Sequence, residues 1–157
     1  SFARMPTPIF KEMNLVDVVE RSIDFYKLST DNKINFKSYK KIVHFKYDEE
    51  QLYRVFINLI KNSEDSIKER KEKDKNFKGK IDIEIKGDND YIHISIVDNG
   101  IGIKDTSKIM TPYFTTKKNG TGLGLPIVNK IINEHKGEMT ITSLKTGAKV
   151  QILFPVL

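Results

Sequence analysis

Two asparagines in the segment Asn58-Leu59-Ile60-Lys61-Asn62 have the spacing and chemistry of a cation site. They lie one helical turn apart in a stretch whose apolar residues recur with helical spacing, so both amides are expected on one helix face. Mg²⁺ takes oxygen ligands and is often held by few protein groups together with substrate phosphates. The amides could also bind nearby backbone groups, and the pair taken alone favours that plainer interpretation.

A second candidate is Asp98-Asn99-Gly100-Ile101-Gly102, which directly follows an expected strand. An aspartate at a strand end can accept hydrogen bonds from an exocyclic amine, and neighbouring glycines let a flat ring approach the backbone. A plain turn would have the same composition, so the alternatives stay open at this point.

Two further segments could contact anions. Pro112 to Lys118 places lysines beside hydroxyls, although an ordinary loop would look the same. Gly120-Thr121-Gly122-Leu123-Gly124-Leu125 runs into an expected helix, whose free N–H groups and dipole favour negative charge. It matches neither the Walker sequence nor the dinucleotide fingerprint. Taken alone, the segment favours phosphate binding and a plain glycine-rich helix start about equally.

The elements that must position these residues follow from hydrophobic periodicity. Helices are predicted over 15–28, from a capping Asp48 to about Ile67, and over 123–135. Strands are predicted at 34–36, 42–47, 81–85, 92–96, 139–143 and 149–154, with a long loop over 99–122. Helices that alternate with strand pairs predict a two-layer α/β sandwich, with a mixed, largely antiparallel sheet and helices on one face.

Composition excludes several classes of function. The chain has 157 residues, which suits one domain, and no cysteine, which excludes disulfides and thiolate chemistry. No apolar run is long enough to span a membrane, and Ser1 to Pro8 does not have the pattern of an export signal. The net charge of +6 comes from lysine rather than arginine, and the basic run Lys68 to Lys80 contains acidic residues. We interpret that run as a solvated helix end and loop, with no nucleic-acid partner.

In the order NLIKN, DNGIG, PYFTTK and GTGLGL, the four segments resemble the N box, first glycine box, F box and second glycine box of the GHKL ATPase superfamily. The chain looks most like the catalytic ATP-binding domain of two-component sensor histidine kinases. The lead-in FARMPTP and the segment TPYFTTKKNGTGLGLPIVNKII are also similar to nitrogen-regulation sensor kinases of the NtrY type. The resemblance implies the Bergerat fold, with residues 1–13 as a lead-in from an upstream dimerisation helix and 14–157 as the catalytic domain.

The resemblance also implies roles for individual residues, with ATP and Mg²⁺ as cofactors. Asn62 would hold Mg²⁺ on the ATP phosphates with support from Asn58, and Asp98 would bind the adenine amine. Gly100 and Gly102 would line the base, and Lys117, Gly120, Gly122 and Gly124 would contact the phosphates. The other cofactor-binding residues would be Thr116, Thr121 and Leu123. Asn58 and Lys117 would be the catalytic residues.

The implied reaction transfers the γ-phosphoryl group to a histidine on an upstream dimerisation domain, in a full-length homodimer that serves a response regulator. The resemblance places this domain in the cytoplasm, without direct membrane contact, in what can be an inner-membrane sensor. None of His44, His93 and His135 has the context of the acceptor histidine.

Two departures from the family pattern stand out. Ser63, Glu64, Asp65 and Ser66 follow Asn62 where many relatives have a basic residue, and His135-Lys136-Gly137 replaces the usual paired glycines. The alternatives are an ATP-sensing pseudokinase or interaction module, a GHKL ATPase, or an anti-sigma serine kinase.

Overall fold

The computed structural model describes residues 5–103 and 124–156. Within these ranges the chain forms three helices and seven strands. In chain order they are β1 (Lys11–Asn14), α1 (Leu15–Lys27), β2 (Lys33–Ser38), β3 (His44–Tyr47), α2 (Glu49–Lys73), β4 (Lys80–Gly87), β5 (Tyr91–Asp98), α3 (Gly124–Glu134), β6 (Glu138–Ser143) and β7 (Ala148–Pro155).

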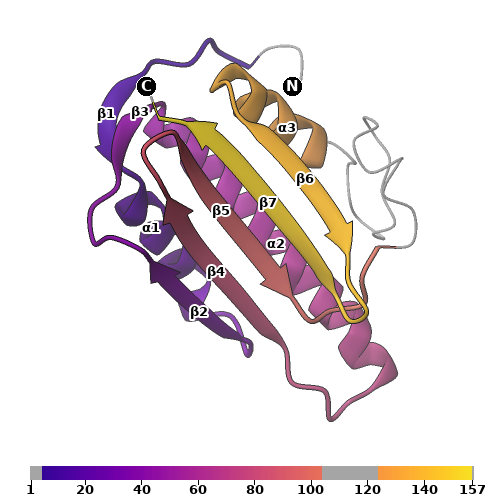
Figure 1. The fold of residues 1–157 in the computed structure, drawn as a ribbon. Coiled ribbons are helices and arrows are strands. Elements are labelled where there is room, and N and C mark those ends of the chain that lie inside the picture. Colours follow the sequence, from indigo (N-terminus) through magenta and orange to yellow (C-terminus); the bar gives the residue numbers. More distant parts are fainter. Residues whose placement is uncertain (1–4, 104–123, 157) are drawn as a thin grey trace.

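The main sheet has five strands in the order β2-β4-β5-β7-β6. Only β2 and β4 pair in parallel, and the other three pairings are antiparallel. All three helices lie on one face of this sheet (Figure 1). The predicted two-layer α/β sandwich with a mixed, largely antiparallel sheet is therefore confirmed.

The core lies between the sheet and the helices. Alternate residues of β4 and β5 point inward, and six isoleucines on these strands are at most 1% exposed: Ile81, Ile83, Ile85, Ile92, Ile94 and Ile96. They meet the apolar side of α2, where Phe56, Leu59 and Ile60 are also almost fully buried. The apolar residues at every second position of β4 and β5 and those at helical spacing in α2 thus pack into one core.

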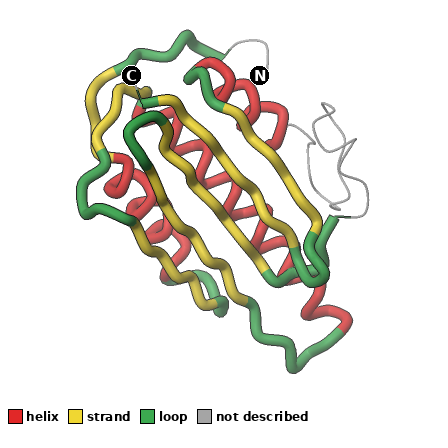
Figure 2. Tube along the Cα trace, in the orientation of Figure 1, coloured by secondary structure: helices red, strands yellow, loops and turns green. Residues whose placement is uncertain are grey.

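Helix α2 begins as the sequence predicts, because the Asp48 side chain accepts a hydrogen bond of 3.0 Å from the Gln51 N–H. It continues to Lys73, so the first part of the basic run Lys68 to Lys80 is helix and the rest is mostly loop before β4 (Figure 2). The interpretation of this run as a helix end and loop is confirmed.

Strand β1 was not predicted, because four polar or mixed residues show no alternation that periodicity could detect. It pairs with β3 in a separate two-stranded sheet. Asn14 links the start of α1 to the residue before β3, since its Oδ1 accepts hydrogen bonds from the N–H groups of Val16 and Val43. One amide oxygen therefore caps α1 and fixes the entry to β3.

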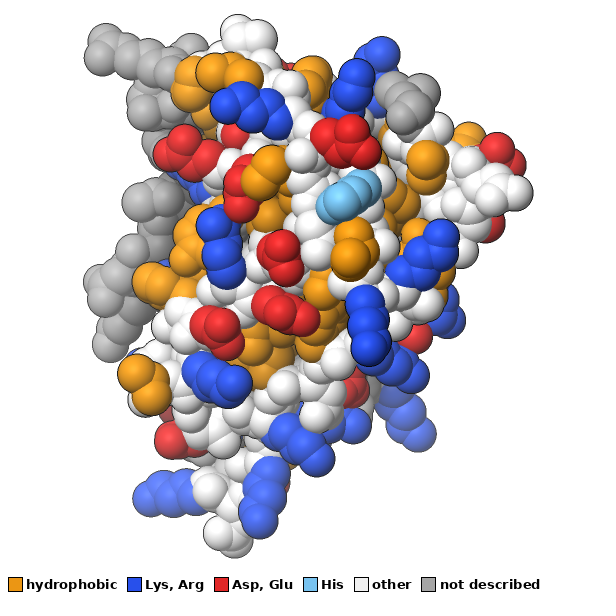
Figure 3. All heavy atoms as spheres, turned by 90° about the vertical axis from the view of Figure 1, so that its left-hand side faces the viewer, with side chains coloured by type: hydrophobic (Ala, Val, Ile, Leu, Met, Phe, Trp, Pro, Cys, Tyr) orange, Lys and Arg blue, Asp and Glu red, His pale blue; other side chains and the backbone are white. Residues whose placement is uncertain are grey.

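The side of the molecule that carries β1, β3, α1 and β2 shows basic and acidic side chains near one another, with hydrophobic ones between them (Figure 3). Within residues 5–103 and 124–156, no helix combines the length and apolar character needed to cross a membrane.

Candidate functional site

Asp98 ends β5 with its side chain in the interior, where the residue is only 7% exposed. Its Oδ1 accepts from the Gly100 N–H at 2.9 Å, and its Oδ2 accepts from the Ser63 hydroxyl at 3.2 Å. Burial raises the pKa of this carboxyl, and the hydrogen bonds oppose the rise. Because a carboxylate has about four acceptor positions, Asp98 retains capacity for a further donor.

The turn between β6 and β7 supports Asp98 from the opposite side. Ala148 donates a backbone hydrogen bond to the Asp98 carboxyl, and Gly147 has a φ of +85°. A Cβ on Gly147 would lie 2.7 Å from the Asp98 carbonyl carbon and 2.8 Å from Asn99 Cα. Only glycine allows both this conformation and this close approach.

Gly100 and Gly102 occupy two different environments in the same loop. A Cβ on Gly100 would lie 2.7 Å from the Ser66 carbonyl carbon and 2.8 Å from the Ile67 nitrogen, so the loop packs directly on the α2 backbone. Gly102 has a φ of +84° and faces Gly147 and Ser143 of the β6–β7 hairpin. The loop is therefore held between a helix and a hairpin.

Asn58 faces the start of α3. Its Nδ2 donates to the Arg54 carbonyl at 2.8 Å, and a Cβ on Gly124 would lie 3.8 Å from its Oδ1. The amide oxygen is thus directed toward the N-terminal end of α3, where the second glycine motif ends. The structure brings these two predicted site residues together.

Asn62 is half-buried on α2, one turn after Asn58. Within the described residues, no group of three or more His, Cys, Asp and Glu side chains could hold a metal. A site made of one or two amide oxygens plus ligand phosphates fits the preference of Mg²⁺ for oxygen and for a mostly non-protein shell. The donor set therefore fits a metal that arrives with a phosphate ligand.

The acidic residues that follow Asn62 have structural partners. Glu64 accepts hydrogen bonds from Thr30 Oγ1 and Asn32 Nδ2 in the turn after α1. Asp65 forms an ion pair of 3.3 Å with Lys61 on the helix surface. The departure from the family pattern at these two positions is therefore accounted for by contacts within the domain.

Six predicted site residues lie outside the described residues: Thr116, Lys117, Gly120, Thr121, Gly122 and Leu123. The roles expected for them remain predictions.

Ser63 and the Gly147-Ala148 pair belong to the site although no sequence pattern indicated them. Ser63 is 35 positions from Asp98, and no local pattern relates the two residues. The approach of the Thr146-Gly147 turn to Asp98 depends on the pairing of β7 with β5, which sets Ala148 opposite Asp98. A glycine in a short turn beside a buried strand was the available signal.

The histidines have no place in this site. His44 and His93 are exposed. His135 is buried, its Nε2 accepts from the Asp48 N–H at 3.0 Å, and its Nδ1 lies 2.8 Å from the Ile131 carbonyl. Because Nε2 is the acceptor, the proton of the neutral ring is on Nδ1. His135 therefore has a structural role, and the other two histidines are surface residues.

The profile of the histidine kinase-, DNA gyrase B- and HSP90-like ATPases matches residues 47–157. A putative sensor histidine kinase NtrY-like of Rickettsia felis is 36% identical over 98% of this chain and 25% of its own length. Sporulation kinase A of Bacillus subtilis is 38% identical over 75% of this chain and 19% of its own length. The chain thus spans about a quarter or less of these relatives.

Among solved structures, the nucleotide-free catalytic domain of histidine kinase ThkA aligns with a TM-score of 0.82 and 26% identity. The alignment covers 94% of this chain and 96% of that domain. The likeness therefore extends over nearly the whole of both molecules.

Proposed function

Since the chain belongs to the histidine kinase-, DNA gyrase B- and HSP90-like ATPase family, we propose that it binds Mg-ATP and donates the γ-phosphoryl group to a histidine of a separate dimerisation domain. The observation that carries this proposal is the Asp98 carboxylate, buried at a strand end beside a glycine loop and able to accept one more hydrogen bond. An adenine amine is a donor of the required kind.

The phosphates extend from the Asp98 loop toward the facing pair formed by Asn58 and Gly124. Asn62 holds the metal through its amide oxygen, with Asn58 in support, and the N-terminal end of α3 attracts the phosphate charge. Bound Mg²⁺ neutralises the charge on the phosphates. Thr116, Lys117, Gly120, Thr121, Gly122 and Leu123 complete the nucleotide contacts in this proposal.

In the transfer, an acceptor histidine nitrogen bonds to the γ-phosphorus while the bond to the β,γ-bridging oxygen breaks and ADP leaves. The chain contributes position and charge stabilisation, which is the main demand of phosphoryl transfer. The partners in this proposal are the upstream dimerisation domain of a full-length homodimer and a response regulator. The site of action is the cytoplasm.

Asn58 distinguishes this proposal from an ATPase. An amide has no useful basicity, so it cannot activate water as a glutamate would. Hydrolysis by the chain alone should be slow. A pseudokinase is favoured only by the acidic residues after Asn62, and Glu64 and Asp65 have structural partners. An anti-sigma serine kinase would transfer the phosphoryl group to a hydroxyl instead.

The test is to incubate the chain with γ-labelled ATP and Mg²⁺, alone and with a cognate dimerisation domain. We expect acid-labile label on the histidine of the added domain and an unlabelled chain. Chelation of Mg²⁺ and omission of the added domain are the controls. Acid-stable label, or fast phosphate release that Asn58→Ala abolishes, would contradict the proposal.

A further inference from the structure

Three polar residues on one face of α2 contact the loop that contains Asp98. Ser63, Ser66 and Arg70 are spaced by three and four positions, so they share a face along two helical turns. Ser63 donates to Asp98, the hydroxyl of Ser66 accepts from the Ile101 N–H at 3.0 Å, and Arg70 Nη1 donates to the Asn99 carbonyl at 2.6 Å. One helix face thus binds residues 98, 99 and 101 of the loop.

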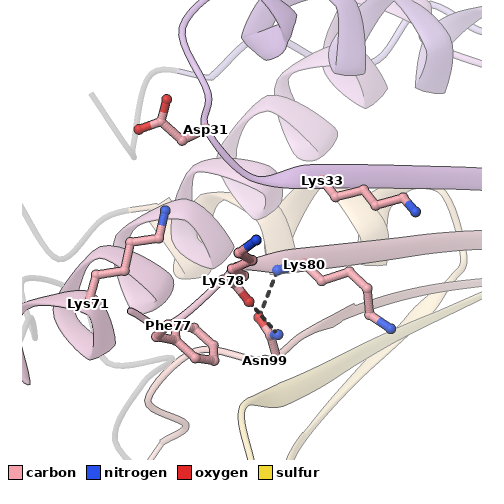
Figure 4. A pocket seen from close by; sticks show the side chains of 8 residues that line it. Asp31, Lys33, Lys71, Phe77, Lys78, Lys80 and Asn99 are labelled. Atoms are coloured by element: carbon pink, nitrogen blue, oxygen red, sulfur yellow. Dashed lines mark hydrogen bonds between the residues drawn. The ribbon is translucent and has the colours of Figure 1, made fainter. Parts of the chain in front are cut away.

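The other side of Asn99 is fixed as well. Its Oδ1 accepts from the Lys80 N–H at 2.8 Å, and its Nδ2 donates to the Lys78 carbonyl at 3.1 Å (Figure 4). Asn99 lies in an open pocket that three lysines, Lys33, Lys71 and Lys80, also line. In Figure 4, Lys71 extends in a different direction from Lys33 and Lys80. The hydrogen bonds of Asn99, rather than a converging set of ammonium groups, are the ordered feature here.

Arg70 is itself held in place. Its guanidinium carbon lies 3.9 Å from the centre of the Phe77 ring, a close cation–π arrangement. The guanidinium is half-buried between this ring and the Asn99 carbonyl. A charged donor fixed in this way makes a stronger hydrogen bond than a mobile surface lysine would.

We propose that Arg70 and Ser66 are positioning residues that hold the 98–101 loop in its ligand-binding conformation before nucleotide binds. This inference rests on the proposed function, because it assigns the loop to ATP. Neither residue needs to touch the nucleotide. Their effect is to remove the entropy cost of ordering the loop on binding, which otherwise reduces affinity.

The contacts predict a graded effect on ATP affinity. Loss of the charged Arg70 hydrogen bond in Arg70→Ala should weaken binding about tenfold. Ser66→Ala should weaken it roughly threefold, because the Ile101 N–H also lies 3.2 Å from the Ser66 backbone carbonyl. Arg70→Lys keeps the charge but lacks the planar guanidinium, so its ATP affinity should be intermediate between those of Arg70→Ala and the unchanged chain.

The experiment combines calorimetric titration of Mg-ATP with amide hydrogen exchange in nucleotide-free protein. Lys68→Ala is the matched control, since this exposed lysine lies on the same helix and its loss changes charge as Arg70→Ala does. We expect Arg70→Ala and Ser66→Ala to accelerate exchange at the Ile101 amide and to weaken ATP binding, while Lys68→Ala does neither. Circular dichroism checks that each variant is folded, and Ser66→Ala is the milder test should Arg70→Ala unfold.

Affinity and Ile101 exchange in both variants equal to those of Lys68→Ala would overturn the inference. Failure of the unchanged chain to bind ATP would instead overturn the proposed function. The exchange measurement needs no nucleotide, so it still tests whether the two residues hold the loop.

Discussion

Asp98 and His135 are buried to the same extent, each 7% exposed, yet only Asp98 has the properties of a binding residue. Burial disfavours the charged form of both, so it raises the pKa of Asp98 and lowers that of His135. Both ring nitrogens of His135 have partners inside the domain, whereas the Asp98 carboxylate can accept a further hydrogen bond. Spare hydrogen-bonding capacity, rather than burial or a shifted pKa, therefore distinguishes the two sites.

The backbones near Asp98 and His135 both contain residues with positive φ, but the residue types differ. Gly102 and Gly147 have positive φ near Asp98, and Lys136, next to His135, has a φ of 62°. Lys136 is the one non-glycine residue with a positive φ in the described part of the chain. The Asp98 loop needs glycine because backbones meet there, while the end of α3 places a long side chain in solvent-accessible space.

The largest effect is expected for Gly147→Ala. The methyl group would overlap the backbone of Asp98 and Asn99, and alanine would be strained at a φ of +85°. We expect a loss of about 3 kcal/mol or more in the free energy of unfolding, measured by urea denaturation. A loss below about 1 kcal/mol would show that the loop has room to move.

Asp98→Asn should weaken ATP binding by roughly 10- to 150-fold, because a charged acceptor is lost and an amide donor can face the adenine amine. Thermal stability should change little, because the loss of a buried charge and the loss of one acceptor for the Gly100, Ser63 and Ala148 donors act in opposite directions. Burial raises the Asp98 pKa, so the ionised carboxylate opposes folding at neutral pH, and this effect disappears below the ordinary pKa of 3.8.

The raised pKa also means that ATP affinity should decline with acidification before an ordinary aspartate would protonate. Calorimetric titrations with ATP and GTP over a pH series measure both effects. Asp90→Asn, in the exposed β4–β5 turn, is the control and should leave affinity unchanged. Equal affinity of Asp98→Asn for ATP and GTP, at the level of the unchanged chain, would contradict the adenine assignment.

His135→Gln should separate stability from binding. The lowered pKa of His135 means that the unfolded chain takes up a proton first, so stability should decrease as the pH falls below the ordinary value of 6.5. The decrease is about 1.4 kcal/mol for each unit by which burial lowers the pKa. The hydrogen bond to the Ile131 carbonyl, and then the charges of Asp48 and Glu134, raise the pKa of His135 and so limit the decrease.

Glutamine can accept from the Asp48 N–H but does not titrate, so this part of the pH dependence should disappear while ATP affinity stays within about twofold. Urea unfolding over a pH series provides the measurement. The exposed His93 gives the control variant His93→Gln, which should keep the dependence. Persistence of the full dependence in His135→Gln would assign it to another group.

The smallest effect is expected for Lys136→Gly. Gly137 N–H bonds to Ile132 and Lys136 N–H to Asn133, which is the Schellman arrangement that ends a helix. Glycine fits the left-handed position without strain, so stability should rise by about 0.5 to 1 kcal/mol, with ATP affinity unchanged. A lower melting temperature in calorimetry would mean that the Lys136 side chain contributes a contact that outweighs its strain.

Local spacing was sufficient to predict all three helices, the main strand pairs and the aspartate cap of α2. The order of four short motifs was sufficient to predict the family. Helix and strand periods and capping depend on residues close together in the chain, and each of the four motifs is itself a short local segment. The end of the helix predicted over 123–135 lies within one residue of the end of α3 at Glu134 for the same reason.

Only the tertiary structure decided what surrounds Asp98. Ser63 is 35 positions away in sequence, Arg70 is 29 positions from Asn99, and Gly147 reaches the loop through the register of β7 against β5. Strand β1 likewise exists through its pairing with β3, since its own residues show no alternation. Such contacts depend on how helices pack and strands align across the sheet, and one sequence contains no local periodicity that records them.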